Sequence, residues 1–329
     1  MTRIIVAICL TLSAAASGAD AADYPVRPLR LVVGFDEGGP TDIPARFVAE
    51  KLGDRLGQRV IVENEHKLGA VGLLATDVLS QARDGYNLLL CTHDEAISAA
   101  IYEDRAAWAL PTGFTVFRLA EFAPISLIAK YSYGVALSSS VPAHDVASFV
   151  DYAKGHPGDI NYTLVGAGST QVVLWRQLEK LAGIPIMKQT PFPYGPRAVQ
   201  ELVAGRVDVY VGPSPDVIPH DDSGEVRLIA VTSPARLPAA PRVPTLREAG
   251  IEYVRYGWLG ICAGRGTPQP VIDRLNREIV AVVATAEYRT MIENTGSIAI
   301  SSSPDELGQV IRETLEDAAA TVREFQQDP

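Results

Sequence analysis

Apolar segments of two different periods alternate along the first part of the chain. Residues 29–35 (LRLVVGF) form a nearly continuous apolar run, as a parallel strand buried on both faces does. In residues 42–56 the apolar positions recur at helical spacing instead. The alternation continues with a strand over 59–64, a helix over 70–82 and a strand over 87–92. This order predicts right-handed βαβ units in a doubly wound α/β sheet.

The pattern is irregular over 100–120 and then resumes. Two strands are expected next, over 122–129 and 133–139. The elements expected after them are helices over 145–155, 169–182 and 196–204, strands over 160–166, 186–190, 207–212, 226–233 and 257–264, and closing helices over 269–284, 286–294 and 304–325.

Two βαβ systems therefore stand in series, and the closing helices have no sheet of their own. If these helices pack back on the first system, the chain crosses between two lobes twice, near residues 129 and 230. We expect one lobe from residues 23–129 plus 231–329 and the other from 130–230, each a doubly wound sheet flanked by helices. Two crossover strands form a hinge, so a ligand is expected in the cleft between the lobes.

The first 22 residues predict a cleavable signal peptide. Arg3 supplies a positive start, residues 4–12 are apolar, and Ala19–Ala22 offers a cleavage site between small residues. The apolar run is too short to span a bilayer. We therefore expect export to the periplasm.

Charge and cysteine content narrow the function further. The formal net charge is −10, which argues against nucleic acid and anionic membrane surfaces as partners. No zinc-type spacing of Cys or His is present, so we expect no metal and no cofactor. Cys91 and Cys262 lie in expected strands. An oxidising compartment permits a disulfide between them, but the favoured interpretation is two small buried side chains.

The segment GFDEGGPTD (34–42) joins the first strand to the first helix. Gly38 and Gly39 let the backbone approach a ligand closely because they have no Cβ. The first amides of the helix lack intrahelical partners, and with the helix dipole they form an anion site. Asp42 is placed to cap the helix or to fix the turn by accepting backbone N–H bonds. A tight strand–helix turn without a ligand explains the segment equally well.

The segment TLVGAGSTQ (163–171) repeats this design in the second lobe. Gly168 precedes Ser169, Thr170 and Gln171 at a helix N-terminus. Neither turn has dinucleotide or P-loop spacing, so a nucleotide is not expected. Two helix N-termini that face one cleft would hold a small carboxylate, with the three polar side chains bonding it from the side. For Ser169 alone, an ordinary N-cap is the simpler interpretation.

A third loop, TPFPYGPRAV (190–199), carries aromatic residues and an arginine. Phe192 or Tyr194 would pack on the apolar part of a ligand, and Arg197 would pair with a carboxylate. The alternative places Phe192 in the lobe interface and Arg197 in solvent, and for Arg197 we favour that alternative.

A series of phrases resembles the receptors of tripartite tricarboxylate transporters, the Bug or TctC-type periplasmic solute-binding proteins. It begins with YPVRPLRLVVGFDEGGPTDIPARFVAEKLGDRLGQRVIVENEHKLGAVG and continues through DGYNLLL, FAPISLIA, GAGSTQ, VQELVAGRVDV, VRLIAVTSPAR, PRVPTLREAG and WLGICAGRGTP. The resemblance implies a type II-like binding-protein fold, no enzymatic activity, capture of a small organic acid, delivery to a membrane permease and a monomeric state. The ligand-binding residues expected on this basis are Phe35, Gly38, Gly39, Thr41, Asp42, Thr92, Gly168, Ser169, Thr170, Gln171, Phe192 and Tyr194.

The chain departs from the family pattern by adding acid near the expected cleft. Asp36 and Glu37 lie in the first turn, and His93, Asp94 and Glu95 lie in the loop expected after the third strand. A dicarboxylate would be repelled there, so the ligand is expected to carry at most one carboxylate and a cationic or amide group that one of these acids accepts. The alternative is that the acids line the outer rim.

Two other functions share these residues. Ser169, His93 and Asp42 would form the triad of an exported hydrolase, but GAGST lacks the nucleophile-elbow spacing. A receptor that contacts a membrane sensor instead of a permease would have the same fold.

Overall fold

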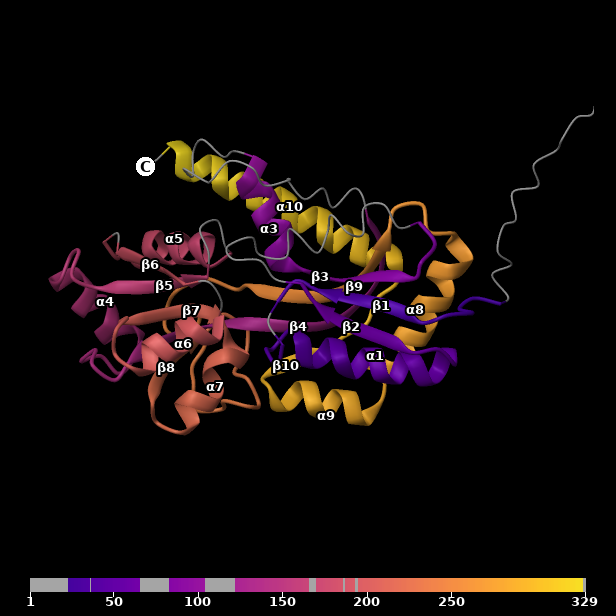
Figure 1. Ribbon diagram of the computed structural model, residues 1–329. Coiled ribbons are helices and arrows are strands. Elements are labelled where there is room, and N and C mark those ends of the chain that lie inside the picture. The colour runs from indigo at the N-terminus through magenta and orange to yellow at the C-terminus, as the bar shows by residue number, and fades with distance from the viewer. Residues whose placement is uncertain are drawn as a thin grey trace, which may run out of the picture.

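The computed structural model describes residues 23–35, 37–65, 83–103, 122–165, 170–185, 187–192 and 195–327. The expected signal peptide and the helix predicted over 70–82 lie outside these residues. Within them, ten strands form a mixed sheet with the order β2-β1-β3-β9-β4-β7-β5-β6, and β8 and β10 both pair with β4. Figure 1 shows the helices on both sides of this sheet.

The first half of the sheet is built on parallel strands. β1 (Leu29–Val33) lies between β2 (Val60–Asn64) and β3 (Asn87–Thr92) and is parallel to both. β9 (Tyr256–Gly264) then pairs antiparallel with β3 on one side and with β4 on the other. The apolar runs of β1 and β3 are buried, as expected for strands covered on both faces.

β4 (Phe122–Ser138) is one long strand that belongs to both halves of the molecule. It pairs with β9 as far as Ser132 and with β10 (Ser297–Ala299), and from Tyr133 onward it pairs with β7 (Val209–Pro213) and β8 (Val226–Val231). The expectation of two separate strands here was wrong. The polar residues Lys130 and Ser132 interrupt the apolar run without interrupting the ladder, and shifts of register bend the strand instead.

The second half continues the sheet with parallel strands and its own helices. β5 (Asn161–Val165) lies between β7 and β6 (Lys188–Phe192) and is parallel to both. The helices are α4 (Val146–Gly155), α5 (Thr170–Ala182), α6 (Gly195–Val203) and α7 (Ser214–Asp222). The pattern had not predicted α7, because its two prolines and short apolar set hide the helical period.

Helices from both ends of the chain cover the first half. They are α1 (Asp42–Leu56), α3 (His93–Glu103), α8 (Gln269–Val283), α9 (Ala286–Asn294) and α10 (Pro304–Gln327). α8 packs on α1 and β4, while α10 packs on α3 and β4 and also contacts α5 of the second half (Figure 1). The start of α3 corrects the sequence interpretation, since residues 93–95 were expected in a loop and residues 100–103 in an irregular segment.

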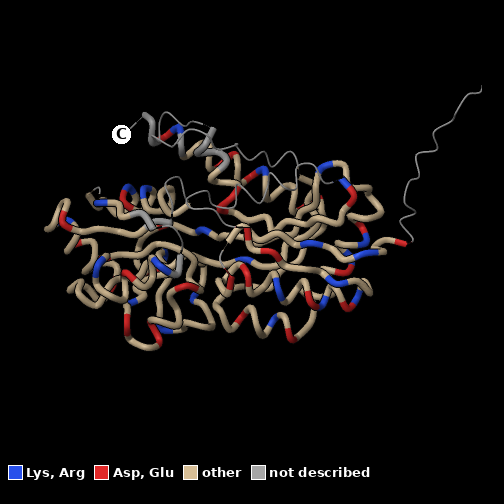
Figure 2. The backbone as a smooth tube through the Cα atoms, viewed as in Figure 1, with Lys and Arg blue, Asp and Glu red and all other residues tan. Residues whose placement is uncertain are grey.

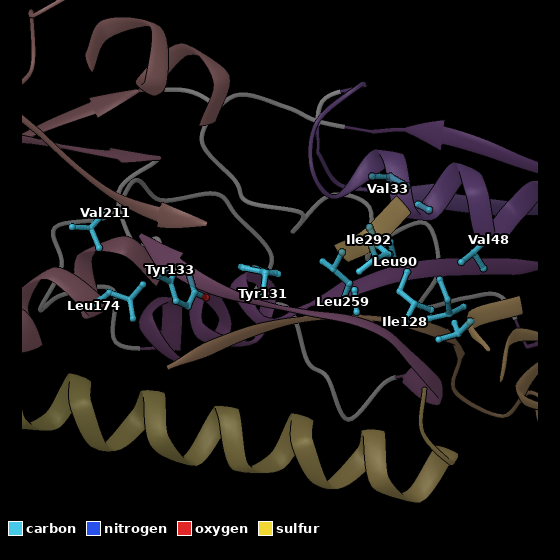
Figure 3. Packing of buried hydrophobic residues seen from close by; sticks show 14 of the residues in the cluster. Val33, Val48, Leu90, Ile128, Tyr131, Tyr133, Leu174, Val211, Leu259 and Ile292 are labelled. Atoms are coloured by element: carbon cyan, nitrogen blue, oxygen red, sulfur yellow. The ribbon is translucent and has the colours of Figure 1, made fainter. Parts of the chain in front are cut away.

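A continuous apolar core runs through both halves. Figure 3 shows Tyr131 and Tyr133 of β4 between Leu174 and Val211 on one side and Leu259 and other apolar residues on the other. Figure 2 shows acidic and basic residues interspersed along both halves.

Cys91 and Cys262 form a disulfide, which corrects the favoured interpretation of two separate thiols. Both residues are fully buried, and their Cα atoms are 5.9 Å apart. Neighbouring antiparallel strands bring them together, since Cys91 lies opposite Gly260 and Leu89 lies opposite Cys262. The sequence alone did not show that β3 and β9 are neighbours.

Candidate functional site

A network around Asp42 fixes the turn after β1. The Asp42 side chain is fully buried, and its Oδ2 accepts hydrogen bonds from the Gly38 amide (2.8 Å) and from Nε of Arg46 (2.7 Å). Its Oδ1 accepts from Nδ2 of Asn64 (2.8 Å), which also donates to the Phe35 carbonyl (2.9 Å). The prediction that Asp42 fixes the turn through a backbone N–H is therefore confirmed. Asn64 was missed because it is adjacent to the turn only in the fold. Arg46 was also missed, although it lies four residues after Asp42 on the same helix.

Opposing effects set the pKa of the Asp42 carboxyl. Burial raises this pKa, but the hydrogen bonds from Arg46, Gly38 and Asn64 together outweigh burial and hold it below its ordinary value. Asp42 is therefore ionised at neutral pH, and both of its oxygens are already engaged by the turn.

Fewer helix amides are open than the sequence predicted. The amides of Asp42 and Ile43 both donate to the Gly39 carbonyl, at 3.0 and 3.1 Å, so these two do not point outward. Among the described residues, the amides of Gly39 and Thr41 have no hydrogen-bond partner, and Gly39 is buried. Gly38 adopts a φ of 76°, which a residue with a Cβ rarely tolerates. The donors that this turn offers are thus the amides of Gly39 and Thr41.

The turn after β3 lies at the same edge of the sheet. β1 and β3 are parallel neighbours, so their carboxyl ends point the same way. Thr92 caps α3 through a capping box: its amide donates to Oε2 of Glu95 (2.9 Å), and the Glu95 amide donates to Oγ1 of Thr92 (3.3 Å). Thr92 and Glu95 thereby hold each other in place, and both are buried.

Asp94, between these two residues in the chain, faces the second half of the molecule. Tyr131 Oη donates to its Oδ2 at 3.2 Å, and the hydroxyl of Thr170 at the start of α5 lies near enough to lower its pKa. Burial is the larger effect and raises that pKa above its ordinary value. Thr170 is the first residue of α5 and Asp94 the second of α3, so the helix start that follows β3 adjoins the helix start of the second half. The two helices also contact each other.

Tyrosines and acids surround Asp94 and form a cluster that the sequence pattern had not predicted. We define the acid–tyrosine cluster as Asp94, Glu95 and Asp216 with Tyr131, Tyr133 and Tyr210. Within it, Tyr210 Oη donates to Oδ2 of Asp216 at 2.6 Å, and the rings of Tyr131 and Tyr133 meet edge to face. The alternation YSY in a buried strand was the available signal, because it places two hydroxyls on one face.

Burial raises the pKa of each acid in the cluster. It raises the pKa of Asp216 to about 6 and that of Glu95 well above its ordinary value. His93 at the same helix start shares a hydrogen bond of 2.9 Å with Tyr133 Oη, and burial, with a smaller effect of Arg255, lowers its pKa to about 3. His93 is therefore neutral at pH 7.

The remaining predicted residues are buried, exposed or outside the described part of the chain. Phe35 is half-buried and packs against the core, while Thr170 and Gln171 are buried at the start of α5. Phe192 ends β6, and its side chain is among those not described; Gly168, Ser169, Tyr194 and Asp36 lie outside the described residues. Glu37 faces solvent, with its side chain 76% exposed and paired with Arg46 at 3.1 Å.

The described contacts do not assemble a hydrolytic triad. Asp42 is engaged by Gly38, Arg46 and Asn64, and Nδ1 of His93 by Tyr133. Among the hydrogen bonds of the described residues, none joins a carboxylate to the histidine that would have to act as the base.

A family model described as a tripartite tricarboxylate transporter family receptor matches residues 44–326. The chain belongs to this family. It is 29% identical to Protein BugT of Bordetella pertussis over 328 residues, which cover 98% of each chain. The family consists of periplasmic solute-binding receptors, which are not enzymes.

Solved structures show the same fold. The chain is similar to MatC from Rhodopseudomonas palustris with bound malate, with a TM-score of 0.79, 28% identity and coverage of 91% of this chain and 100% of that one. It is also similar to R. palustris Rpa4515 with adipate, with a TM-score of 0.80, 26% identity and coverage of 91% and 98%. The periplasmic binding protein BugD matches with a TM-score of 0.80 and 26% identity over 92% of this chain and 98% of that one. The fold is thus a two-lobed periplasmic binding protein, and none of its described helices is long and apolar enough to cross a membrane.

Proposed function

We propose that this protein is an exported receptor that binds a small organic acid or a related metabolite between its lobes. The ligand carboxylate is held by main-chain donors of the turn after β1 and by the start of α5, and the loaded receptor delivers it to a tripartite tricarboxylate-type permease. The signal peptide over residues 1–22 and the lobe boundaries near residues 129 and 230 are part of this proposal.

One structural observation carries the proposal. The turns after the parallel strands β1 and β3 share a sheet edge, and the second of them adjoins the N-terminus of α5 in the other half. At the first turn, the Asp42 network holds the Gly38–Gly39 backbone in place, and the amides of Gly39 and Thr41 have no partner within the described ranges. Such preorganised, unpaired donors suit a carboxylate. The malate and adipate bound by two relatives agree with that ligand class.

Thermal shift and calorimetric titration of the chain from residue 23 test the proposal. The panel holds monocarboxylates, dicarboxylates, amino acids and amides. A carboxylate-bearing compound should raise Tm in a concentration-dependent way and be recovered unchanged. Replacement of Thr41 by proline removes an open amide at a position beside the helix start and should weaken binding about tenfold or more. If no carboxylate-bearing compound binds, or if the ligand is consumed, the proposal is wrong.

A further inference from the structure

We propose that Asp94 accepts a hydrogen bond from a positively charged nitrogen of the ligand, so that this receptor selects amino-carboxylates over dicarboxylates. This inference rests on the proposed function and specifies its ligand class. It follows from the position of Asp94, from two enclosed oxygens beside it and from the balance of charge around it.

Asp94 lies where the two halves meet. It is the second residue of α3, so it projects from the helix start that follows β3 at the sheet edge. Tyr131 donates to its Oδ2, Thr170 of α5 faces it, and part of the residue remains exposed. A ligand held by the turn after β1 and by the start of α5 therefore has Asp94 within its reach.

Two fully buried oxygens beside Asp94 have no hydrogen bond of ordinary geometry to a described residue. They are Oγ1 of Thr170 and Oε1 of Glu95, and both residues are 0% exposed. The Thr170 hydroxyl lies close enough to Asp94 to lower its pKa, and its lone pairs remain open to a donor. Buried polar atoms are rarely left unpaired, because each costs about 1–3 kcal/mol. The Thr170 hydroxyl lies on the α5 side of Asp94 and Glu95 on the α3 side, so a donor-rich group placed between the halves would satisfy them.

Acids outnumber cations around Asp94 in the described part of the chain. Arg255 acts on His93 and Tyr133 nearby, but it is not among the groups that act on Asp94. No ion pair in the described part of the chain joins a Lys or Arg to Asp94, Glu95 or Asp216. By contrast Asp42, at the turn that would hold the carboxylate, pairs with Arg46 at 2.7 Å. An ammonium group has three donors and one positive charge, and it would supply what this cluster lacks. A second carboxylate in the same place would add charge of the same sign.

Matched ligands separate this proposal from the proposed function. Succinate and 3-aminopropanoate share a two-methylene spacer, glutarate and 4-aminobutanoate a three-methylene spacer, and adipate and 5-aminopentanoate a four-methylene spacer. In each pair one carboxylate is replaced by an ammonium. For the best-fitting spacer, calorimetry at pH 7 should give at least a tenfold lower Kd for the amino-carboxylate.

Two variants locate the preference in the chain. Asp94→Asn should weaken binding of the amino-carboxylate at least tenfold and bring the dicarboxylate of the same length to equal or tighter binding. Asp151→Asn, which removes an exposed acid of α4, should retain the parental preference. Circular dichroism verifies folding. If Asp94→Asn does not fold, the test rests on the parent protein alone, through the ratio of its Kd for the dicarboxylate to its Kd for the amino-carboxylate.

The possible failures differ. Tighter binding of the dicarboxylates by the parent protein overturns the role of Asp94 and leaves the proposed function standing. The role of Asp94 is also overturned if Asp94→Asn keeps the parental ratio of the two Kd values. It is overturned as well if a neutral ω-amide of the same spacer binds as tightly as the ammonium compound. Absence of binding by every carboxylate overturns both proposals.

Discussion

The Asp42→Ala replacement tests whether the turn after β1 depends on one buried carboxylate. The variant removes the acceptor of two hydrogen bonds, one from the Gly38 amide and one from Nδ2 of Asn64, each 2.8 Å long in the parent protein. A hydrogen bond to a charged acceptor contributes about 1.5–3 kcal/mol. The Arg46 pair adds little, because that side chain is 41% exposed. We therefore expect the free energy of unfolding to fall by about 3 kcal/mol.

Urea unfolding and ligand titration measure the two consequences separately. The turn should also lose the order that holds the Gly38–Gly39 backbone, so the affinity for the best ligand should fall about tenfold or more. Asp208→Ala is the matched control, because Asp208 accepts from the amide (2.9 Å) and Nδ2 (2.8 Å) of Asn161 away from this turn. It should lower stability while leaving affinity unchanged.

The pH dependence gives an independent check of the same network. The folded pKa of Asp42 lies below its ordinary value of 3.8, so the carboxylate stabilises the fold above that pH. This contribution is lost as pH falls through the folded pKa, and Asp42→Ala should lack it. A loss of stability under 1 kcal/mol in Asp42→Ala, or an equal loss of affinity in the Asp208 control, would refute the reasoning.

Three further predictions concern the core and the acid–tyrosine cluster. Replacing Cys91 and Cys262 by serine removes a crosslink between residues 171 positions apart and should lower the free energy of unfolding by about 3–5 kcal/mol. Urea unfolding of parent and variant, with and without reductant, measures this loss. Equal stability of the two proteins without reductant would show that the bridge does not form. Gly257→Ala places a Cβ in steric clash with the hydroxyl end of the Tyr131 ring, so it should lower the free energy of unfolding by about 1–3 kcal/mol and weaken the preference for an ammonium ligand. Parental stability and preference would contradict that packing. The folded pKa of Asp216 is about 6 against 3.8 when unfolded, so stability should fall as pH rises between these values. Asp216→Asn should match the parent below pH 4 and exceed it by about 3 kcal/mol at pH 7, and a parallel pH profile would exclude this effect.

The sequence predicted the features that depend on local period and turn chemistry. β1, α1 and β3 follow from apolar spacing, and Asp42 was placed at its turn correctly because its backbone partner, Gly38, lies four residues away. What the pattern missed depends on contacts between distant segments. Asn64 reaches Asp42 only because β2 pairs with β1.

The same distinction applies to the acids after β3. The sequence presented Asp94 and Glu95 as equivalent loop acids, with either the cleft or the rim as their place. The helix that begins at His93 separates them, because it turns Glu95 back onto the Thr92 amide as a capping residue and leaves Asp94 facing Tyr131 and the other half. Neighbouring acids thereby receive different roles, a distinction that composition cannot show.

The charge state of Asp94 determines which ligand the cluster favours. The groups that face it are Glu95 on α3, Tyr131 and Tyr133 on β4, Thr170 on α5, Tyr210 on β7 and Asp216 on α7. Arg255 acts on the neighbouring His93 and Tyr133, but it is not among the groups that shift the pKa of Asp94. Within the described residues no cation therefore balances the ionised carboxyl, and a cationic ligand would do so. Protonation removes the charge, weakens the attraction for an ammonium group and relieves the repulsion of a second carboxylate. The preference for amino-carboxylates therefore belongs to the pH range above the raised pKa of Asp94, and it narrows as pH falls through that value.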